Sequence, residues 1–256
     1  MTAPAPDNSA ADTFYARTAE YVAVLLESAW ESLGPTLAAA LDGLDPAAGP
    51  VVDVGAGSGL GTRVIARALP ATEIFAVEPD RALRTALLAT IAADSDLRAR
   101  VTVLDTDLLS ADLPDRVGGL VAMNVLGHFP PTERTRLWAL LAERLAPQGR
   151  AVLDLYPPHR PEAVPATPMA DIVLGRRHYS GVAAAEPGGA DAIIWEMSYR
   201  VEQDGRPVAS LSAHERWYVL SPGQLADELG AHGLRLRTHG ATDTMFVIDR
   251  GPASRR

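Results

Sequence analysis

Short apolar runs and longer amphipathic segments alternate along most of the chain, and this pattern predicts a parallel sheet covered by helices on both faces. Apolar, β-branched strands are expected at 51–54, 74–78, 101–104, 120–124 and 151–156. Apolar residues at helical spacing predict helices at 60–69, 80–93 and 132–145. The fold class is therefore α/β.

The residues before the first strand follow a helical period instead. Phe14, Tyr21, Val22, Leu25, Trp30 and Leu33 recur at the spacing of one amphipathic helix. Gly34-Pro35 is expected to end this helix, and Pro35 to open a second one through Leu41. We expect a disordered leader at 1–13 and an N-terminal helical lid at 14–50.

The period changes to two after Pro157. A proline-rich loop is followed by a stripe of apolar residues on one strand face, namely Ile193, Trp195, Met197, Tyr199 and Val201. The turn 203–207 leads to a returning strand at 208–220, so 157–220 is expected to be an inserted antiparallel sheet. Its apolar stripe would form either part of a lid or the face of a homodimer.

The alternation resumes with a helix at 222–233 and strands at 234–238 and 245–249. These complete a main sheet of seven strands, so the core comprises 51–156 and 221–250. A length of 256 residues suits one large domain of this kind.

Composition and charge narrow the partners. The net charge is −9, and the longest basic runs are pairs such as Arg176-Arg177, so binding to nucleic acid is disfavoured. No apolar run approaches the roughly 18 residues of a membrane span. The N-terminal residues do not have the pattern of a signal peptide, and we expect a cytoplasmic protein.

Two missing residue types exclude several chemistries. The chain has no cysteine, which excludes disulfides, thiolate nucleophiles and sulfur-ligated metals. It also has no lysine, which excludes a Schiff-base lysine and the lysine of a P-loop. The stretch 214-HERWY-218 lacks the second histidine of a zinc helix, so no metal is expected.

A glycine-rich loop follows the first strand. In 51-VVDVGAGSGLGT-62, glycine recurs at every second position from Gly55 to Gly61. The dinucleotide spacing G-x-G-x-x-G would need a third glycine at Leu60 or Thr62, so a nicotinamide dehydrogenase is a minor alternative. The spacing instead lets the backbone approach a ligand closely.

The motif set resembles a known family. Residues 51-VVDVGAGSG-59, Glu78 at the end of the second strand and 101-VTVLDTD-107 are similar to the first three motifs of class I S-adenosylmethionine-dependent methyltransferases. The resemblance runs from about Phe14 to Asp249. It implies a Rossmann-like seven-stranded sheet and S-adenosylmethionine as cofactor, with S-adenosylhomocysteine as product.

The resemblance also implies roles for single residues. Glu78 would accept both ribose hydroxyls, and Asp107 the adenine amino group with the Leu108 N–H behind it, although Asp105 competes for that role. Asp53 would orient the loop or meet the cofactor's amino group. The remaining cofactor residues would be Gly55, Ala56, Gly57, Gly59 and Asn124.

The fourth strand indicates the acceptor. Asn124 to Gly127 is not the Asn/Asp-Pro-Pro-aromatic motif of enzymes that methylate nucleic acids or protein amides. The following GHFP resembles small-molecule methyltransferases acting on amino sugars and natural products. In that subgroup a histidine, here His128, borders the acceptor pocket with a tyrosine, Tyr15 or Tyr21. Histidine titrates near neutrality, which suits a general base, but His128 could also cap a helix. We prefer Tyr15 as the lid residue.

The expected function is methyl transfer (EC 2.1.1.-) to O or N of a small-molecule acceptor. Cyclisation on the same fold and a non-enzymatic relic remain alternatives. In the strand at 208–220, Glu215 and Trp217 share one face, and His214 and Arg216 share the other. Either face could line the pocket. We prefer the interpretation in which Trp217 packs in the interior while His214 and Arg216 are exposed to solvent. The lysine-free composition suggests a bacterium of high GC content and secondary metabolism.

Overall fold

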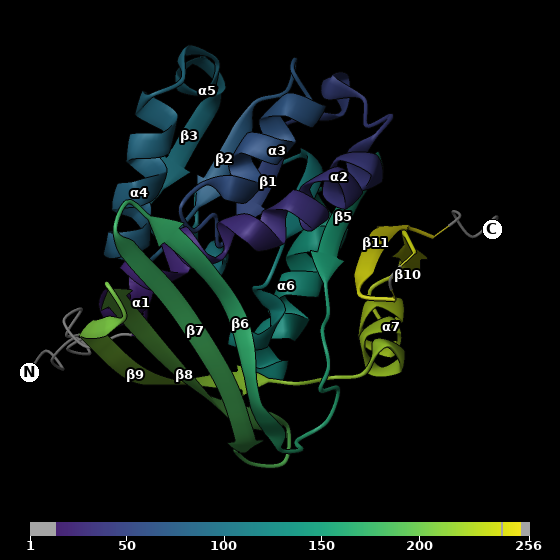
Figure 1. Cartoon of the computed structure of the whole chain (residues 1–256). Coiled ribbons are helices and arrows are strands. Elements are labelled where there is room, and N and C mark those ends of the chain that lie inside the picture. Colours follow the sequence, from purple (N-terminus) through teal and green to yellow (C-terminus); the bar gives the residue numbers. More distant parts are fainter. Residues whose placement is uncertain (1–13, 242, 252–256) are drawn as a thin grey trace, which may run out of the picture.

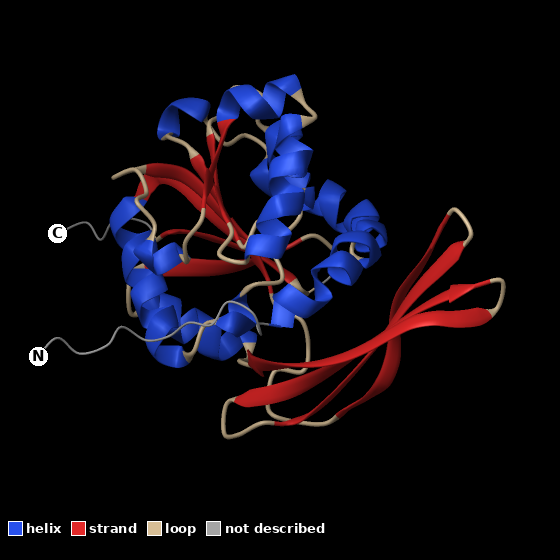
Figure 2. Cartoon of the chain, turned by 90° about the vertical axis from the view of Figure 1, so that its left-hand side faces the viewer, coloured by secondary structure: helices blue, strands red, loops and turns tan. Residues whose placement is uncertain are grey.

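The computed structural model describes residues 14–241 and 243–251 and contains two sheets, of seven and of four strands. The expected leader at 1–13 lies outside the described residues. Figure 1 shows the larger sheet at the centre of the molecule with helices around it, and Figure 2 shows the smaller sheet projecting from this α/β body. The larger sheet carries the expected Rossmann-like fold.

The seven-stranded sheet has the order β10-β11-β5-β4-β1-β2-β3. Its strands are β1 (Val51–Val54), β2 (Ile74–Val77), β3 (Val101–Leu104), β4 (Val117–Ala122), β5 (Leu145–Asp154), β10 (Leu234–His239) and β11 (Met245–Arg250). Neighbours from β3 to β5 pair in parallel, whereas β11 runs antiparallel to β5 and β10. A short loop without a crossover helix joins β10 to β11, and such a connection requires antiparallel strands.

Helices cover both faces because the strands are apolar on both. The helices are α2 (Glu27–Leu41), α3 (Leu60–Ala68), α4 (Arg81–Ala92), α5 (Ser95–Arg100), α6 (Pro131–Arg144) and α7 (Pro222–Gly230), with 3-10 turns η1 (Pro46–Ala48), η2 (Leu108–Ser110) and η3 (Leu126–His128). Val51 and Ile74 pack with α2 to α5, while Val52 and Leu153 pack with α6 and α7. Two cores therefore enclose the sheet.

The N-terminal helices differ from the expectation at Pro35. Helix α1 (Phe14–Leu25) ends before Leu26, and Pro35 lies inside α2 rather than at its start. The prediction of a break at Gly34-Pro35 is wrong because proline removes only one backbone donor, at a cost of about 3 kcal/mol. Leu37 and Leu41 are fully buried among residues of α3 and β1, and this burial keeps the turn helical.

The smaller sheet has more strands than the alternation indicated. Its order is β6 (Val164–Leu174), β7 (Arg177–Pro187), β8 (Ala192–Gln203) and β9 (Arg206–Tyr218). The first of these replaces part of the expected proline-rich loop. It is an edge strand that pairs only with β7, and its other edge has no neighbouring strand. Pro165 and Pro168 are tolerated because a backbone N–H on that unpaired edge would have no strand to bond. Most of its side chains are exposed, so its sequence does not alternate between apolar and polar residues as a half-buried strand would.

Helix α1 packs on the apolar stripe of β8. Tyr21 stacks on Tyr199 with ring centroids 4.8 Å apart, and Leu25 packs beside Val201. Ile193, the first residue of the stripe, is fully buried and packs with Ala185 of β7 and with Val219. Trp195 and Met197 are half-buried, and the rest of the stripe packs within the chain, so the structure favours a role in the lid over a dimer face.

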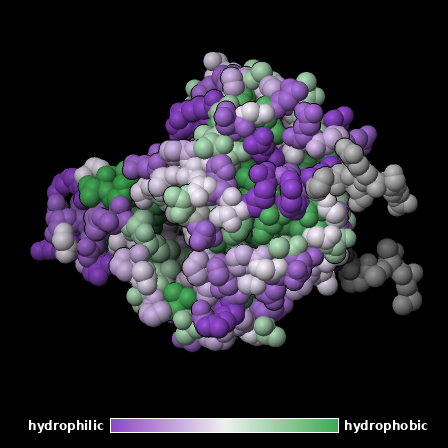
Figure 3. Space-filling view, turned by 90° about the vertical axis from the view of Figure 1, so that its right-hand side faces the viewer, coloured by the Kyte–Doolittle hydropathy of each residue, from purple (hydrophilic) through white to green (hydrophobic). Residues whose placement is uncertain are grey.

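The outer surface is mixed in polarity. Figure 3 shows, from the side of α7, β10 and β11, hydrophilic residues interspersed with small groups of hydrophobic ones. Across the described residues, none of the helices combines the length and the apolar character that crossing a membrane would require.

Candidate active site

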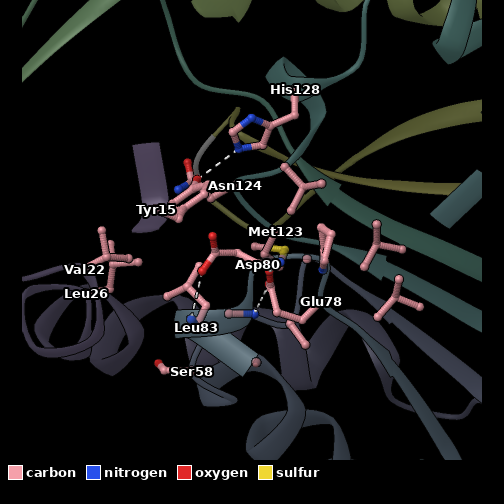
Figure 4. A pocket seen from close by; sticks show the side chains of 18 of the residues that line it. Tyr15, Val22, Leu26, Ser58, Glu78, Asp80, Leu83, Met123, Asn124 and His128 are labelled. Carbon is pink, nitrogen blue, oxygen red and sulfur yellow. Dashed lines mark hydrogen bonds between the residues drawn. The ribbon is translucent and has the colours of Figure 1, made fainter. Parts of the chain in front are cut away.

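A cavity of about 1100 Å³ opens at the carboxyl ends of β1 to β5. Helix α1 and the first turns of α2 cover it with apolar side chains, among them Val22, Leu26, Trp30 and Leu33. Figure 4 shows Tyr15 and His128 on one side of this cavity and Glu78 and Asp80 on the other. Ligands of open α/β sheets bind at this edge, so the cavity is the candidate active site.

The glycine loop turns sharply between β1 and α3. Gly55, Gly57 and Gly59 all have left-handed backbone angles, with φ of 63°, 58° and 92°. A Cβ at Gly55 would lie 2.6 Å from Val125, whereas one at Gly57 would approach described atoms no closer than 3.9 Å. The loop therefore leaves its inner surface open at Gly57, and Ala56 and Ser58 line the cavity beside it.

The last two glycines make room for protein rather than for a ligand. Gly59 was expected beside the cofactor, but a Cβ there would meet Leu87 at 3.0 Å, and the residue lies outside the cavity lining that is described. The left-handed turn places Gly59 beside α4, and its contact with the cofactor stays a prediction. Gly61 lets Trp30 pack closely, since a Cβ there would lie 2.9 Å from its indole.

Glu78 joins the end of β2 to the glycine loop. Its carboxylate accepts the backbone N–H of Gly57 and that of Asp80, each at 2.8 Å. Burial raises the pKa of Glu78, and these two hydrogen bonds oppose the rise. A buried carboxylate with free lone pairs thus faces the cavity opposite the open surface of the loop.

Asp53 acts behind the loop. Its Oδ2 accepts the Thr62 hydroxyl at 2.6 Å, and the residue is almost fully buried outside the cavity lining that is described. Burial raises the pKa of Asp53 to about 7, the Thr62 hydrogen bond opposes this, and Glu78 adds to it. This position fits the role of orienting the glycine loop rather than that of contacting the cofactor's amino group.

The end of β3 contributes Asp107 and Leu108. Both line the cavity, whereas Asp105 is absent from the cavity lining that is described. One Asp107 oxygen accepts the Ser110 N–H at 3.1 Å, which begins η2 and fixes the carboxylate. The geometry therefore favours Asp107 over its competitor as the carboxylate that contacts a ligand.

Asp154 at the end of β5 was not predicted. Its Oδ1 accepts the N–H of Asn124, a cavity residue with a left-handed φ of 56°, at 2.6 Å. Its Oδ2 is buried without a hydrogen-bond partner among the described residues. Burial raises the pKa of Asp154 to about 7, and the Asn124 hydrogen bond opposes the rise. The rule that selected Glu78, a carboxylate ending a buried strand, would also have found it.

Asp154 makes stability depend on pH. Its pKa is higher in the folded chain than the ordinary 3.8, so only the folded state holds the proton between about pH 4 and 7. The contribution of Asp154 to stability is therefore fully present below about pH 4 and is lost as the pH rises through about 7, a change on the order of 4 kcal/mol. Asp154→Asn should melt several degrees above the wild type at pH 8.5 and much closer to it at pH 5. A difference independent of pH would contradict this.

His128 and Tyr15 contact each other on one side of the cavity. The Tyr15 hydroxyl lies 3.0 Å from Nε2 of His128, and the two rings pack edge to face at 5.7 Å. Burial raises the pKa of Tyr15 far above its ordinary value, and the carboxylate of Glu215 adds to this, so the phenol stays neutral. Of the two tyrosines considered, Tyr15 lines the cavity and Tyr21 packs on Tyr199.

Strand β9 closes the far side of the imidazole. Glu215 Oε1 lies 3.5 Å from His128 Nδ1, and the Trp217 indole packs edge to face on the same ring at 4.7 Å. The opposite face, with His214 and Arg216, is exposed. The face of Glu215 and Trp217 is thus the one that borders the cavity, and no pattern in the sequence indicated which residue Glu215 would meet.

The order of the strands divides the cavity at β4. The glycine-loop half, from the ends of β1 to β3, consists of Gly55 to Ser58, Glu78, Asp107 and Leu108. The histidine half consists of Tyr15, His128, Asp154, Tyr156 and Glu215. Pockets for one small molecule measure about 300–1000 Å³, so this cavity has room for two ligands side by side.

Comparison with known proteins identifies the domain. Residues 51–149 match the family profile described as "Methyltransferase domain". These residues form a methyltransferase domain. The matched range contains the whole glycine-loop half and His128. No curated protein matches the full sequence at a significant level.

Solved structures extend the likeness beyond the methyltransferase domain. Streptomyces venezuelae DesVI superposes with a TM-score of 0.73 at 17% identity, covering 91% of this chain and 96% of that one. CalS10, an amino pentose methyltransferase from Micromonospora echinaspora, gives 0.69 at 17%, covering 87% and 92%. The sugar N-methyltransferase KedS8 from Streptoalloteichus gives 0.66 at 17%, covering 86% and 87%. At this identity the likeness shows the fold.

The comparisons agree with the geometry. The resemblance to class I S-adenosylmethionine-dependent methyltransferases is confirmed, and S-adenosylmethionine is the cofactor of that class. The superposition on DesVI covers 91% of the chain, so it extends well beyond residues 51–149. Two residues that border the methyltransferase domain's cavity, Tyr15 and Glu215, therefore come from segments outside the profile match.

Proposed function

We propose that the chain transfers a methyl group from S-adenosylmethionine to an O or N atom of a small molecule. One observation carries the proposal. A single cavity holds a glycine loop tied to Glu78 on one side of β4 and a histidine paired with a tyrosine on the other. The glycine-loop half holds the cofactor, and the histidine half holds the acceptor.

The glycine-loop half fits the cofactor. The open surface at Gly57 admits the methionine and ribose parts, because a side chain is missing where they pass. The Glu78 carboxylate accepts the ribose hydroxyls with the lone pairs that its backbone hydrogen bonds leave free. Asp107 accepts the adenine amino group beside the Leu108 backbone. Ala56 and Asn124 complete this wall.

The histidine half handles the acceptor. The bound cofactor supplies a methyl group already activated by its sulfonium charge, so the protein mainly positions the acceptor atom at about 3 to 3.5 Å from it. Tyr15 and the apolar residues of α1 and α2 exclude water. Nε2 of His128 receives the proton that the acceptor O–H or N–H gives up.

The acceptor class follows from the neighbours and the cavity together. CalS10 is an amino pentose methyltransferase and KedS8 a sugar N-methyltransferase. The histidine half of this chain presents two carboxylates, Asp154 and Glu215, which suit a polar acceptor rich in hydroxyl or amino groups. We therefore propose a small natural-product intermediate as the acceptor. We also propose that the chain is a cytoplasmic bacterial enzyme of secondary metabolism.

A second reaction on the same cavity is cyclisation with the cofactor as a bound positive charge. The discriminating measurement is the mass of the product, which gains one CH₂ group on methylation and does not change on cyclisation. The His128–Tyr15 pair favours methylation, because it places a proton acceptor beside the reacting atom.

Thermal melting with S-adenosylhomocysteine, S-adenosylmethionine, NAD and NADP tests the cofactor. A ligand at 100 times its dissociation constant stabilises the fold by about 2.7 kcal/mol, which raises Tm by several degrees at this size. We expect a rise with the two adenosyl ligands and none with the nicotinamide ones. Methyl-labelled cofactor with a panel of amino and hydroxylated sugars then tests transfer. A rise with NAD alone would overturn the proposal.

A further inference from the structure

Both ring nitrogens of His128 are engaged, on opposite sides of the ring. Nε2 faces the Tyr15 hydroxyl at 3.0 Å, and Nδ1 faces Oε1 of Glu215 at 3.5 Å. The side chains of His128 and Glu215 are 28% and 24% exposed, so water screens their interaction only in part. The sequence match that identifies the methyltransferase domain ends at residue 149 and does not include Glu215.

Packing fixes Glu215 at this position. Glu215 lies on the edge strand β9, directly opposite Trp195 in the antiparallel ladder with β8. Trp217, two residues further on the same face, packs against the imidazole and fills the space where Gly127 has no side chain. Arg17 of α1 also donates to the Ser212 carbonyl, which holds the helix carrying Tyr15 against the same strand.

The two partners determine which nitrogen holds the proton. An ionised carboxylate only accepts hydrogen bonds, so the 3.5 Å contact between Nδ1 and Glu215 favours the form of the ring with its N–H on Nδ1. A neutral imidazole has a single N–H, which leaves Nε2 with a lone pair. The neutral phenol of Tyr15 can then donate to Nε2.

We propose that Glu215 is a positioning residue that holds His128 in the tautomer with the proton on Nδ1 and a basic lone pair on Nε2. The use of that lone pair rests on the proposed function; the tautomer itself does not. In the reaction the acceptor's O–H or N–H bond breaks and its electron pair stays on the acceptor atom. The proton bonds to the Tyr15 oxygen while the Tyr15 hydroxyl proton bonds to Nε2, so the phenol ends neutral. The imidazolium that results keeps its Nδ1 proton, and the charge of Glu215 balances it.

Nuclear magnetic resonance of the full chain labelled with ¹⁵N-histidine tests the tautomer. Correlations between ring carbon-bound protons and ring nitrogens distinguish Nδ1–H from Nε2–H in each of the six histidines. The signal missing from His128→Asn identifies His128. We expect the Nδ1–H pattern in the wild type and in Tyr15→Phe, recorded at a pH where the ring is neutral. An Nε2–H pattern in the wild type would overturn the proposal.

Two variants separate the hydrogen bond from the charge. In Glu215→Gln the amide oxygen can still accept from Nδ1, so the Nδ1–H pattern should persist. In Glu215→Ala the acceptor is gone, and the Nε2–H form should appear. Persistence of Nδ1–H in Glu215→Ala would refute the role of Glu215. Unchanged signals from the other five histidines show that the variants fold.

Kinetics give the second readout. Glu215→Ala should lower kcat by about 10-fold or more, because the base would hold the wrong tautomer, and should leave the KM for the cofactor unchanged. An equal kcat in variant and wild type would refute the catalytic use. The spectra require no turnover, so failure of methyl transfer and failure of the tautomer assignment are distinguished.

Discussion

Replacing Glu78 by alanine is expected to weaken the binding of S-adenosylhomocysteine by at least about 100-fold. The variant loses the two proposed hydrogen bonds from the ribose hydroxyls to the carboxylate, each contributing about 1.5–3 kcal/mol to binding. A loss of 1.4 kcal/mol weakens the affinity about tenfold. It also frees the N–H of Gly57, which the carboxylate holds at 2.8 Å, so the loop loses its anchor. Isothermal titration calorimetry with S-adenosylhomocysteine measures the change directly.

Two further variants make the result specific. Glu78→Gln keeps one accepting oxygen and should bind with intermediate affinity. Glu73→Ala removes an exposed carboxylate from the opposite end of the same strand, outside the cavity lining that is described, and should bind like the wild type. The buried carboxylate is costly to desolvate, so Glu78→Ala should remain folded in thermal melting. Wild-type affinity in Glu78→Ala would contradict its assignment to the ribose.

Replacing Gly127 by alanine is expected to lower the stability by about 3 kcal/mol, or roughly 10 °C in Tm. The added Cβ would lie 1.9 Å from the Trp217 indole, so the indole must leave its place against η3. Because Trp217 also packs on the His128 ring, the displacement should reduce methyl transfer as well. Thermal melting and the labelled-methyl assay measure the two effects.

The control for this change is another glycine. Gly230 ends α7, and a Cβ there would meet no described heavy atom within 4 Å, so Gly230→Ala should be neutral or slightly stabilising. Combining Gly127→Ala with Trp217→Ala removes the clash, and the two costs should then be less than additive. Additive costs would show that the clash does not cause the loss.

The strands that carry the glycine-loop half could be predicted from local pattern alone. Runs such as 51–54 and 101–104 are short, apolar and bounded by turn residues, and the structure places β1 and β3 at those residues. Glu78 follows β2 directly and Asp107 lies shortly after β3, and the motif resemblance selected both. The parallel order of strands then brings their carboxyl ends together, a consequence of topology that needs no tertiary detail.

The histidine half could be predicted only in part, because its contacts join distant segments. His128 and Tyr15 were selected through the resemblance, but nothing local in the sequence pairs Glu215 with His128. Their contact depends on the register of β9 against β8. Strand β6 was missed for a different reason: an exposed edge strand with prolines lacks the buried alternation that reveals a strand.

The division of the cavity at β4 has an evolutionary consequence. Most residues that would read the methyl donor lie between Gly55 and Leu108, and Asn124 follows shortly after β4 in the same part of the core. Those that would read the acceptor are scattered over α1, η3, the end of β5 and β9. Mutations in the inserted strands can therefore retarget the enzyme to a new scaffold while the donor site stays intact, so descendants of one ancestor can diversify their products without losing their source of methyl groups.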